Sequence, residues 1–462
     1  MRSNKKNINK IMMIFEAIAF VSFILCVIRM DGDKHLLYMA PLGYFIITIL
    51  FRSNFNNLTG NIPKLTIQIL YLIRCVVLPL IYTFVPHIQL FEGKASVAEN
   101  ITYATLLLVY EYFIVQLVIY IYDHTRHKYR SWSYKAGFDI SKIIIVGLLL
   151  FVAFVLLFMP NYGTTFKSVF ELGQAEFTVA EQYNDYSVGT TDRAVRTLFS
   201  MSFQLIRVLF PAYVLLMSYR KGKGARFCAG ILVISCFVQL LFLTATFAEA
   251  IVSCFALILF YTKLFPEKNR KTLVLLCICS VGLLVIYFAV RFYVKTELGM
   301  YSKNSGAMVY IAQIINAYFS GIDNVAAVFN VPSGYTAEAL RADLVGAIPF
   351  NTTLFGNSGH KFQYFFNLYN RSYGQIPPSI STGYYYFGPI LAPLFSGIFV
   401  YWSMKYSALA NNTKASLKYI AYTFCSIVFA LGACMYSPAI TLQWFFSWGL
   451  IMIVITHFTR DR

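Results

Sequence analysis

Charged residues are scarce in this chain of 462 residues. They make up 13% of it, whereas soluble domains contain about a quarter, and apolar residues make up 58%. So few charges exclude an ordinary soluble domain and favour a protein that crosses a membrane many times.

Acidic residues are scarcer than basic ones, with 20 Asp and Glu against 38 Lys and Arg and a formal net charge of +18. The basic residues gather in short segments between apolar runs, including 220–226 and 263–271. Lys and Arg favour the cytoplasmic side of a membrane, so these segments are predicted to be cytoplasmic, with both termini inside. The charge therefore indicates topology and contact with membrane lipid, and we expect no nucleic-acid partner.

The positions of the cysteines and the absence of known enzyme motifs exclude further classes of protein. All nine cysteines fall inside apolar runs, so none can link an outer loop, and none has a zinc spacing. No Walker loop, HExxH, GxSxG or dinucleotide fingerprint is present, which leaves an ATP-driven or nucleotide-sugar enzyme without support. Asp31 and Asp33 could chelate a divalent ion but have no third ligand, so we expect neither a metal nor a cofactor.

Apolar runs long enough to cross a hydrocarbon core of about 30 Å recur along the whole chain. They lie near residues 11–28, 36–51, 65–85, 100–122, 141–159, 196–218, 227–243, 248–262, 272–291, 384–404, 419–436 and 440–457. The sequence therefore predicts an all-α integral membrane protein with about twelve transmembrane helices.

Two long outer loops divide the chain. Residues 1–291 are predicted to hold nine of the helices and an outer loop over 160–195, and residues 384–462 hold the last three. Between them, 292–383 forms a large extracytoplasmic loop, too long to lack structure of its own. Its apolar spacing predicts a helix over 308–329 that lies along the outer membrane surface, and a second helix follows Gly334.

The stretch "GQIPPSISTGYYYFG", residues 374–388, ends this loop. Pro377 and Pro378 predict extended backbone, and the glycines permit close approach. Tyr384, Tyr385 and Tyr386 are predicted either to form an aromatic belt at headgroup level or to bind a glycan, whose ring faces stack on aromatics.

Arginines mark one predicted span. Arg193, Arg196 and Arg207 share a helix face, which suits an outward-opening site for a diphosphate. The alternative is that the first two snorkel and Arg207 forms a buried ion pair. Arg74 and Glu111, near mid-membrane in consecutive spans, are predicted to form a structural ion pair.

The large loop supplies the candidate acid–base groups. His360, Asp343 and Asp323 are the candidate catalytic residues, and Arg341 and Arg371 could bind a diphosphate. For each of them a solvated surface role is the alternative.

Two stretches, "FSGIDNVAAVF" and "QIPPSISTGYYYFGPILAPLFSGIFVYW", resemble the Wzy-type polymerases of oligosaccharide repeat units, which make O-antigen and capsular polysaccharide. The general plan covers nearly the whole chain, and the local matches run from about Tyr318 to Tyr401. The chain departs from the family in the hairpin "LTATFAEAIVS", which has Glu249 where many members look as if they carry an arginine.

This resemblance implies a membrane glycosyltransferase with a fold like that of the enzymes that use lipid-linked donors (GT-C-like). It would join repeat units carried on undecaprenyl diphosphate at the outer face of the bacterial cytoplasmic membrane and release the lipid diphosphate, without a metal. A chain-length regulator and a flippase would be its partners. A flippase for lipid-linked oligosaccharides and a transferase like O-antigen ligase remain the alternatives.

Overall fold

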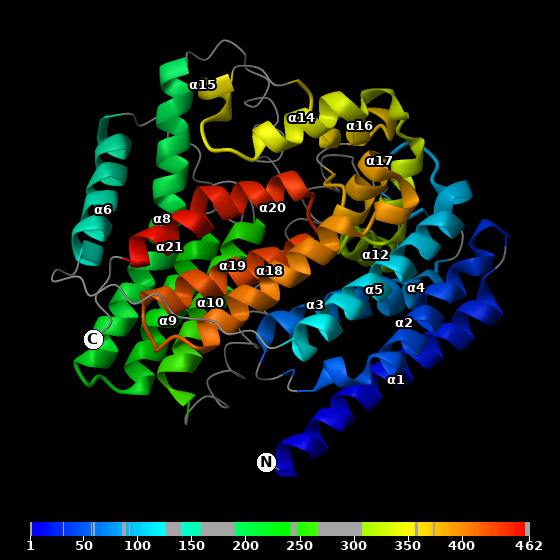
Figure 1. The fold of residues 1–462 in the computed structure, drawn as a ribbon, viewed down its shortest axis with the longest axis horizontal. Helices are drawn as coiled ribbons and strands as arrows, with labels where there is room; N and C mark the ends of the chain where they lie inside the picture. Colours follow the sequence, from blue (N-terminus) through cyan, green and yellow to red (C-terminus); the bar gives the residue numbers. More distant parts are fainter. Residues whose placement is uncertain are drawn as a thin grey trace.

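A computed structural model describes most of the chain. The described residues are 2–30, 32–56, 58, 61–85, 89–91, 93–125, 140–158, 190–241, 247–266, 307–355, 359–372 and 375–457. Their regular structure is all helical (Figure 1). The predicted all-α class is confirmed for these residues.

The N-terminal helices form one side of the molecule, blue to cyan in Figure 1. They are α1 (Arg2–Arg29), α2 (Met39–Leu50), α3 (Ile62–Leu72), α4 (Leu78–Tyr82) and α5 (Ile101–His124). A π-helical turn, Ile73–Val77, joins α3 to α4. Helix α2 packs on α1 and α5, and the rings of Tyr44 and Tyr112 stack between α2 and α5 with centroids 4.9 Å apart.

Four green helices form the other side: α6 (Ile140–Phe158), α8 (Thr190–Arg220), α9 (Ala225–Leu241) and α10 (Phe247–Leu264). Helix α8 packs against the other three.

The C-terminal helices join the two sides. They are α17 (Ser379–Leu391), α18 (Leu394–Asn411), α19 (Leu417–Cys434), α20 (Pro438–Trp444) and α21 (Leu450–His457), with a π-helical turn at Phe445–Gly449. Helix α19 packs against α3, α10 and α18, and it is the most deeply buried of the long apolar helices. The core therefore centres on α19.

The described part of the large loop forms α12 (Ala307–Tyr318), α13 (Ile322–Ala326), α14 (Thr336–Gly346), α15 (Asn351–Phe355) and α16 (Phe362–Tyr369). Helices α14, α15 and α16 lie at one end of the bundle, at the top of Figure 1, and the N-terminus lies at the opposite end. We call the end covered by these three helices the loop end. It is the end for which the charge pattern predicts an extracytoplasmic position.

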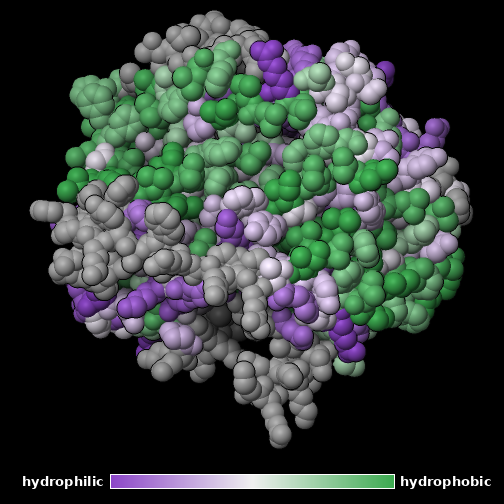
Figure 2. Space-filling view, viewed as in Figure 1, coloured by the Kyte–Doolittle hydropathy of each residue, from purple (hydrophilic) through white to green (hydrophobic). Residues whose placement is uncertain are grey.

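The prediction of about twelve spans is wrong. Six described helices are long and apolar enough to cross a membrane, or seven if α17 and α18 form one broken span. The six are Met12–Arg29, Ile62–Tyr82, Ala98–His124, Thr197–Arg220, Leu417–Cys434 and Pro438–His457, whereas Leu36–Leu50, Lys142–Phe158 and Ala225–Gln239 are shorter. The run at 272–291 lies outside the described residues. Hydrophobic residues spread across the visible face in Figure 2, as expected where helices contact lipid.

The predicted span at 384–404 breaks because Gly388 has a φ of 75° and Pro389 follows it. Helix α17 is kinked there, and α18 begins after a further break at residues 392–393, so that the two helices meet at 108°. Helix α17 begins directly after the extended Pro378, as the two prolines predict. The chain after the kink returns close to Gly383 of α17, where a Cβ would collide with the carbonyl oxygen of Ala392.

The helix predicted over 308–329 is also corrected. It ends at Tyr318, where Ser320 has a φ of 49°, and α13 follows as a separate short helix. Ile322 and Val325 are buried against the bundle, because α13 packs on α5. Helix α13 is therefore part of the protein core.

Candidate functional site

A carboxylate, a phenol and an ammonium group come together at the loop end. Asp343 on α14 is 6% exposed, and Tyr386 on α17 donates a hydrogen bond of 2.6 Å to its Oδ2. Lys361, directly before α16, passes its side chain beside Gly346 on α14. We call Asp343, Lys361 and Tyr386 the loop-end cluster. Three separate helical elements build it.

The pKa of the Asp343 carboxyl group lies closer to neutral pH than that of an ordinary aspartate. Burial raises the pKa of Asp343 to about 6, although the Tyr386 hydroxyl, the charge of Lys361 and the Phe362 N–H each oppose that rise. Burial likewise lowers the pKa of Lys361, and the Asp343 charge opposes this. A carboxyl group with such a pKa can exchange a proton near physiological pH.

Arg207 belongs to a second buried polar group, which we call the α8 cluster: Gln204, Arg207, Gln239 and Glu249. Gln204 bridges the two charges, since its Oε1 accepts from Arg207 Nη1 at 3.3 Å and its Nε2 donates to Glu249. Arg207 Nη2 also donates to the carbonyl of Gln239 at 3.3 Å, and Gln239 Nε2 donates back to the carbonyl of Arg207 at 3.0 Å. Arg207 was predicted to bind a diphosphate or to form a buried ion pair. In the structure it is buried, and the amide of Gln204 connects it to Glu249.

The α8 cluster lies near the start of α17. Burial and the nearby Glu249 carboxylate both raise the pKa of Tyr436, which follows α19. The carbonyl of Tyr436 in turn accepts a hydrogen bond of 3.0 Å from Ser379, the first residue of α17. Arg193 and Arg196 lie on α8 as well, but their side chains fall outside the described part of the structure.

Arg74 and Glu111 form the predicted ion pair. Both are 0% exposed, and Arg74 Nη1 lies 2.9 Å from Glu111 Oε2. Arg74 Nε donates to the carbonyl of Ser320 at 3.0 Å, and Ser396 on α18 donates to Glu111 Oε1 at 2.6 Å. The hydroxyl of Ser320 donates to the carbonyl of Met435 at 2.8 Å. The pair therefore holds together three places where helices break or bend.

Asp323 is not part of the loop-end cluster, and its hydrogen bonds give it a structural role. It is buried on α13, and its Oδ2 accepts the N–H groups of Leu90 and Phe91 at 2.6 and 3.1 Å. Burial raises the pKa of Asp323, and these N–H groups oppose the rise. In this conformation Asp323 fastens the segment at 89–91 to the core, out of reach of a substrate.

The other loop candidates are exposed. His360 donates its backbone N–H to Glu338 Oε1 at 3.0 Å and stacks its ring on Tyr364. Arg341 lies two residues before Asp343 on α14, and Arg371 has a φ of 47°. Sequence order places His360 and Arg341 close to members of the loop-end cluster.

The three tyrosines of the re-entry segment point into the protein. Tyr384 packs on Phe329, with ring centroids 4.7 Å apart, and Tyr385 stacks on Phe362 at 4.5 Å. The Tyr385 hydroxyl donates to the carbonyl of Pro332 at 3.0 Å. These rings fasten the loop to α17 and do not form an exposed belt. Glycan binding by Tyr384, Tyr385 and Tyr386 stays a prediction.

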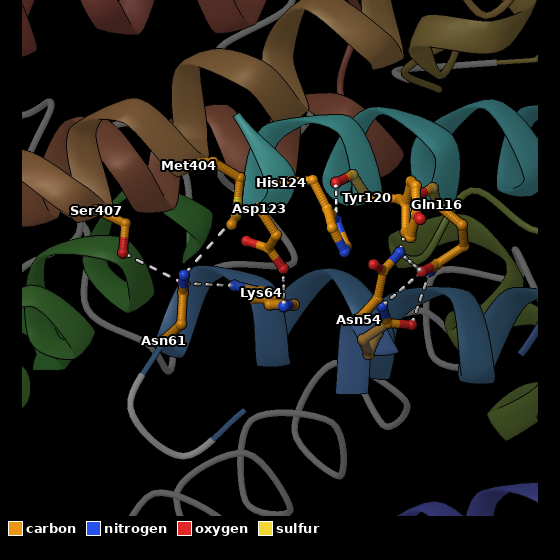
Figure 3. Close-up of polar contacts among 10 residues, drawn as sticks. Asn54, Asn61, Lys64, Gln116, Tyr120, Asp123, His124, Met404 and Ser407 are labelled. Atoms are coloured by element: carbon orange, nitrogen blue, oxygen red, sulfur yellow. Dashed lines mark hydrogen bonds and ion pairs between the residues drawn. The ribbon is translucent and has the colours of Figure 1, made fainter. Parts of the chain in front are cut away.

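Polar side chains also gather at the end of α3 and α5 opposite the loop end (Figure 3). Lys64 pairs with Asp123 at 2.5 Å, and the Nδ2 of Asn54 donates to both the carbonyl and the Oε1 of Gln116 at 2.7 and 3.0 Å. Asn61 caps α3 by accepting from Lys64 N at 3.2 Å. These contacts join α3 to α5.

Sequence reasoning missed three members of these clusters as site residues or assigned them another role. Sequence reasoning assigned no role to Lys361 or Gln204, and it assigned Tyr386 to an aromatic belt or a glycan site. Their contacts join residues far apart in sequence, such as Asp343 and Tyr386. Among the described side chains no group of three or more His, Cys, Asp or Glu could hold a metal ion, and Asp31 and Asp33 lie outside them.

Comparisons with known proteins assign no family. No family model, curated protein or solved structure matches this chain.

Proposed function

We propose that the chain is a membrane glycosyltransferase that polymerises oligosaccharide repeat units carried on undecaprenyl diphosphate, at the outer face of a bacterial cytoplasmic membrane. The loop-end cluster is the observation that carries this proposal. It combines a nearly buried carboxylate, whose pKa is about 6, with a neighbouring lysine at the end of the bundle predicted to face outward. The resemblance of the sequence to Wzy-type polymerases supports the choice of substrate.

The reaction needs a proton acceptor and a stabilised leaving group. The acceptor hydroxyl oxygen forms a bond to the anomeric carbon of the donor, the bond from that carbon to the diphosphate oxygen breaks, and the diphosphate leaves with the electron pair. Asp343 takes the hydroxyl proton. A base whose pKa lies near the working pH combines availability with driving force, which is the balance that Asp343 offers.

Cationic side chains meet the second requirement. Arg341 is exposed on the same helix as Asp343, and Lys361 lies within electrostatic range of that carboxylate. Guanidinium and ammonium groups stabilise the charge that develops on a departing diphosphate. Arg207 lies deeper, and its bridge through Gln204 would have to open before it could contact a phosphate.

Transport of the same lipid-linked oligosaccharide is the second candidate function. One observation favours it, namely the 108° break between α17 and α18. Broken helices and buried charged groups are common at the substrate sites of transporters. The break contributes Tyr386 to the loop-end cluster, so both functions would use the same region.

The test is elongation of a lipid-diphosphate-linked oligosaccharide by purified protein, followed from pH 4.5 to 8. We expect kcat/KM to rise with pH through about 6, because only the ionised Asp343 accepts a proton. Asp343→Asn should lower the rate about 10²- to 10⁴-fold. Tyr386→Phe removes a hydrogen bond that lowers the pKa of Asp343, so its profile should move to higher pH.

Asp123→Asn is the matched control. It also neutralises a carboxylate, but one that lies at the end of α5 farthest from the loop end. Normal elongation by Asp343→Asn would contradict the assignment of the base. Movement of the lipid across a liposome bilayer without any elongation would establish transport instead.

The same carboxylate gives a check that needs no substrate. Because its pKa rises from an ordinary 3.8 to about 6 in the folded protein, the folded state holds the proton more tightly than the unfolded state. Stability should therefore fall as pH rises from about 4 to 6, by about 3 kcal/mol in total. Asp343→Asn should remove this part of the pH dependence in thermal unfolding. If the pH dependence of unfolding were the same in Asp343→Asn as in the wild type, the pKa of Asp343 would not be raised in the folded protein.

A further inference from the structure

Exposed aromatic rings cover the outer side of the loop end. Tyr335 is 37% exposed and Tyr364 is 46% exposed, although both belong to well-packed elements. Together with His360 and Tyr369 they form one connected surface, which we call the aromatic platform. None of its four rings belongs to the re-entry tyrosines, which point inward.

Ring contacts fix the platform in place. His360 lies flat on Tyr364, with centroids 3.9 Å apart and ring planes 16° apart. Tyr335 stacks on Phe365 at 4.5 Å, and Phe365 is itself buried beneath the platform. The Tyr369 hydroxyl donates to the Tyr335 hydroxyl at 3.1 Å. Such rings lose little conformational entropy when a ligand binds, which favours binding.

The pattern of α16 explains why these rings stay outside. Phe362, Phe365 and Phe366 fill its inner face and are buried, whereas Tyr364 and Leu368 follow at a spacing of four on the outer face. The inner face already anchors the helix to the bundle. The ring of Tyr364 is therefore not needed to hold α16 in place.

A carboxylate borders the rings. Glu338 on α14 is exposed, and its Oε1 accepts the backbone N–H of His360 at 3.0 Å. Arg341 lies one helical turn further along α14. Flat aromatic faces beside fixed polar groups match a pyranose, whose C–H face is apolar and whose rim carries hydroxyl groups.

We propose that the aromatic platform is a binding subsite for the pyranose rings of the oligosaccharide, beside the loop-end cluster. The inference rests on the proposed function, since it assigns a place to the glycan of that substrate. Lys361 directly follows His360 in the chain, so a glycan on the platform lies next to the group that neighbours Asp343.

The first experiment measures binding apart from elongation. Purified protein in nanodiscs is screened by saturation-transfer NMR against an array of lipid-free pyranose tetrasaccharides of the kinds found on bacterial surfaces. We expect at least one to bind the wild type, and Tyr364→Ala and Tyr335→Ala to weaken that binding about tenfold each. Tyr364→Phe keeps the ring and should bind normally. Tyr103→Ala removes an exposed ring on α5, outside the platform, and should also have no effect.

The outcomes separate the subsite from the proposed function. Binding that depends on the platform, without any elongation, would support the subsite and contradict the polymerase. Elongation with an unchanged KM in Tyr364→Ala, or no binding to any array member, would overturn the subsite and leave the polymerase standing.

A second measurement addresses lipid. Tyr364→Trp is prepared in nanodiscs with brominated lipids, and its fluorescence is compared with that in ordinary lipids. We expect no additional quenching beyond that of the wild type. Strong quenching would place this ring in the membrane interface and overturn the proposal.

Discussion

In the described part of the chain, the opposite charges Arg74 and Glu111 and the opposite charges Arg207 and Glu249 are both buried, but their hydrogen-bonding partners differ. Arg74 and Glu111 touch directly at 2.9 Å and have no exposed surface. Arg207 and Glu249 are joined through the amide of Gln204, and each keeps a little exposure, at 5% and 6%. The first pair is placed among chain breaks, and the second lies between three helices of one side.

This difference separates stability from adaptability. A direct, fully buried ion pair is costly to open, because each charge then stays uncompensated in a medium of low dielectric constant. A bridging amide can exchange one partner for another, since each of its hydrogen bonds to a charged group, at about 1.5–3 kcal/mol, costs less to break than a direct buried pair costs to open. We therefore expect the Arg74 pair to hold the fold and the α8 cluster to tolerate rearrangement.

The largest expected effect comes from breaking the direct pair. Arg74→Met leaves Glu111 buried without its partner and removes the donor to the Ser320 carbonyl. We expect a loss of about 3–5 kcal/mol in stability. The fraction of folded protein after heating in detergent, measured by size-exclusion chromatography, reports this loss.

The double variant Arg74→Met with Glu111→Gln is the matched control, because it removes both charges. It should recover part of the lost stability. If Arg74→Met alone melted like the wild type, the pair would not be what holds the three chain breaks together.

A smaller effect is expected in the α8 cluster. Arg207→Met removes hydrogen bonds of 3.3 Å to Gln204 and to the Gln239 carbonyl, and we expect a cost of about 1–3 kcal/mol. Arg207→Lys keeps the charge but loses the planar fork, so it should fold nearly normally yet elongate more slowly if a diphosphate reaches this site. Thermal unfolding and the elongation rate are measured on both variants. Equal losses of stability at positions 74 and 207 would remove the distinction between the two pairs.

The Arg74 pair could be predicted from sequence, whereas its attachments could not. Two opposite charges near the middle of consecutive antiparallel helices have few other partners in a membrane, so pairing follows from local order. The contacts with Ser320 and Ser396 depend on where α12 ends and where α18 turns. Those breaks depend on tertiary packing, which hydropathy does not report.

The predicted number of membrane spans was wrong for a related reason. A run of apolar residues shows that a segment avoids water, but it does not show whether one straight helix results. Gly388 and Pro389 were visible in the sequence, but neither the kink that they introduce into α17 nor the 108° bend between α17 and α18 follows from hydropathy. In the site, Asp343 was a candidate from its residue type alone, and its partner Tyr386 is 43 positions away. Residue types thus singled out one member of the loop-end cluster, and its contacts with the other two depend on the fold.

The smallest effect is expected where a charge pair meets solvent. Lys64 and Asp123 lie 2.5 Å apart, but the Lys64 side chain is 4% exposed and that of Asp123 is 32% exposed (Figure 3). Lys64→Met leaves a carboxylate that water can reach, so we expect a loss of at most about 1 kcal/mol. Asp123→Ala leaves an ammonium group that is almost buried, and it should cost more, unless Lys64 extends its long side chain to solvent. Thermal unfolding of both variants at low and high salt measures this asymmetry. Equal and salt-insensitive losses would mean that this pair is as well sealed as Arg74 and Glu111, and that exposure does not set the order of the three pairs.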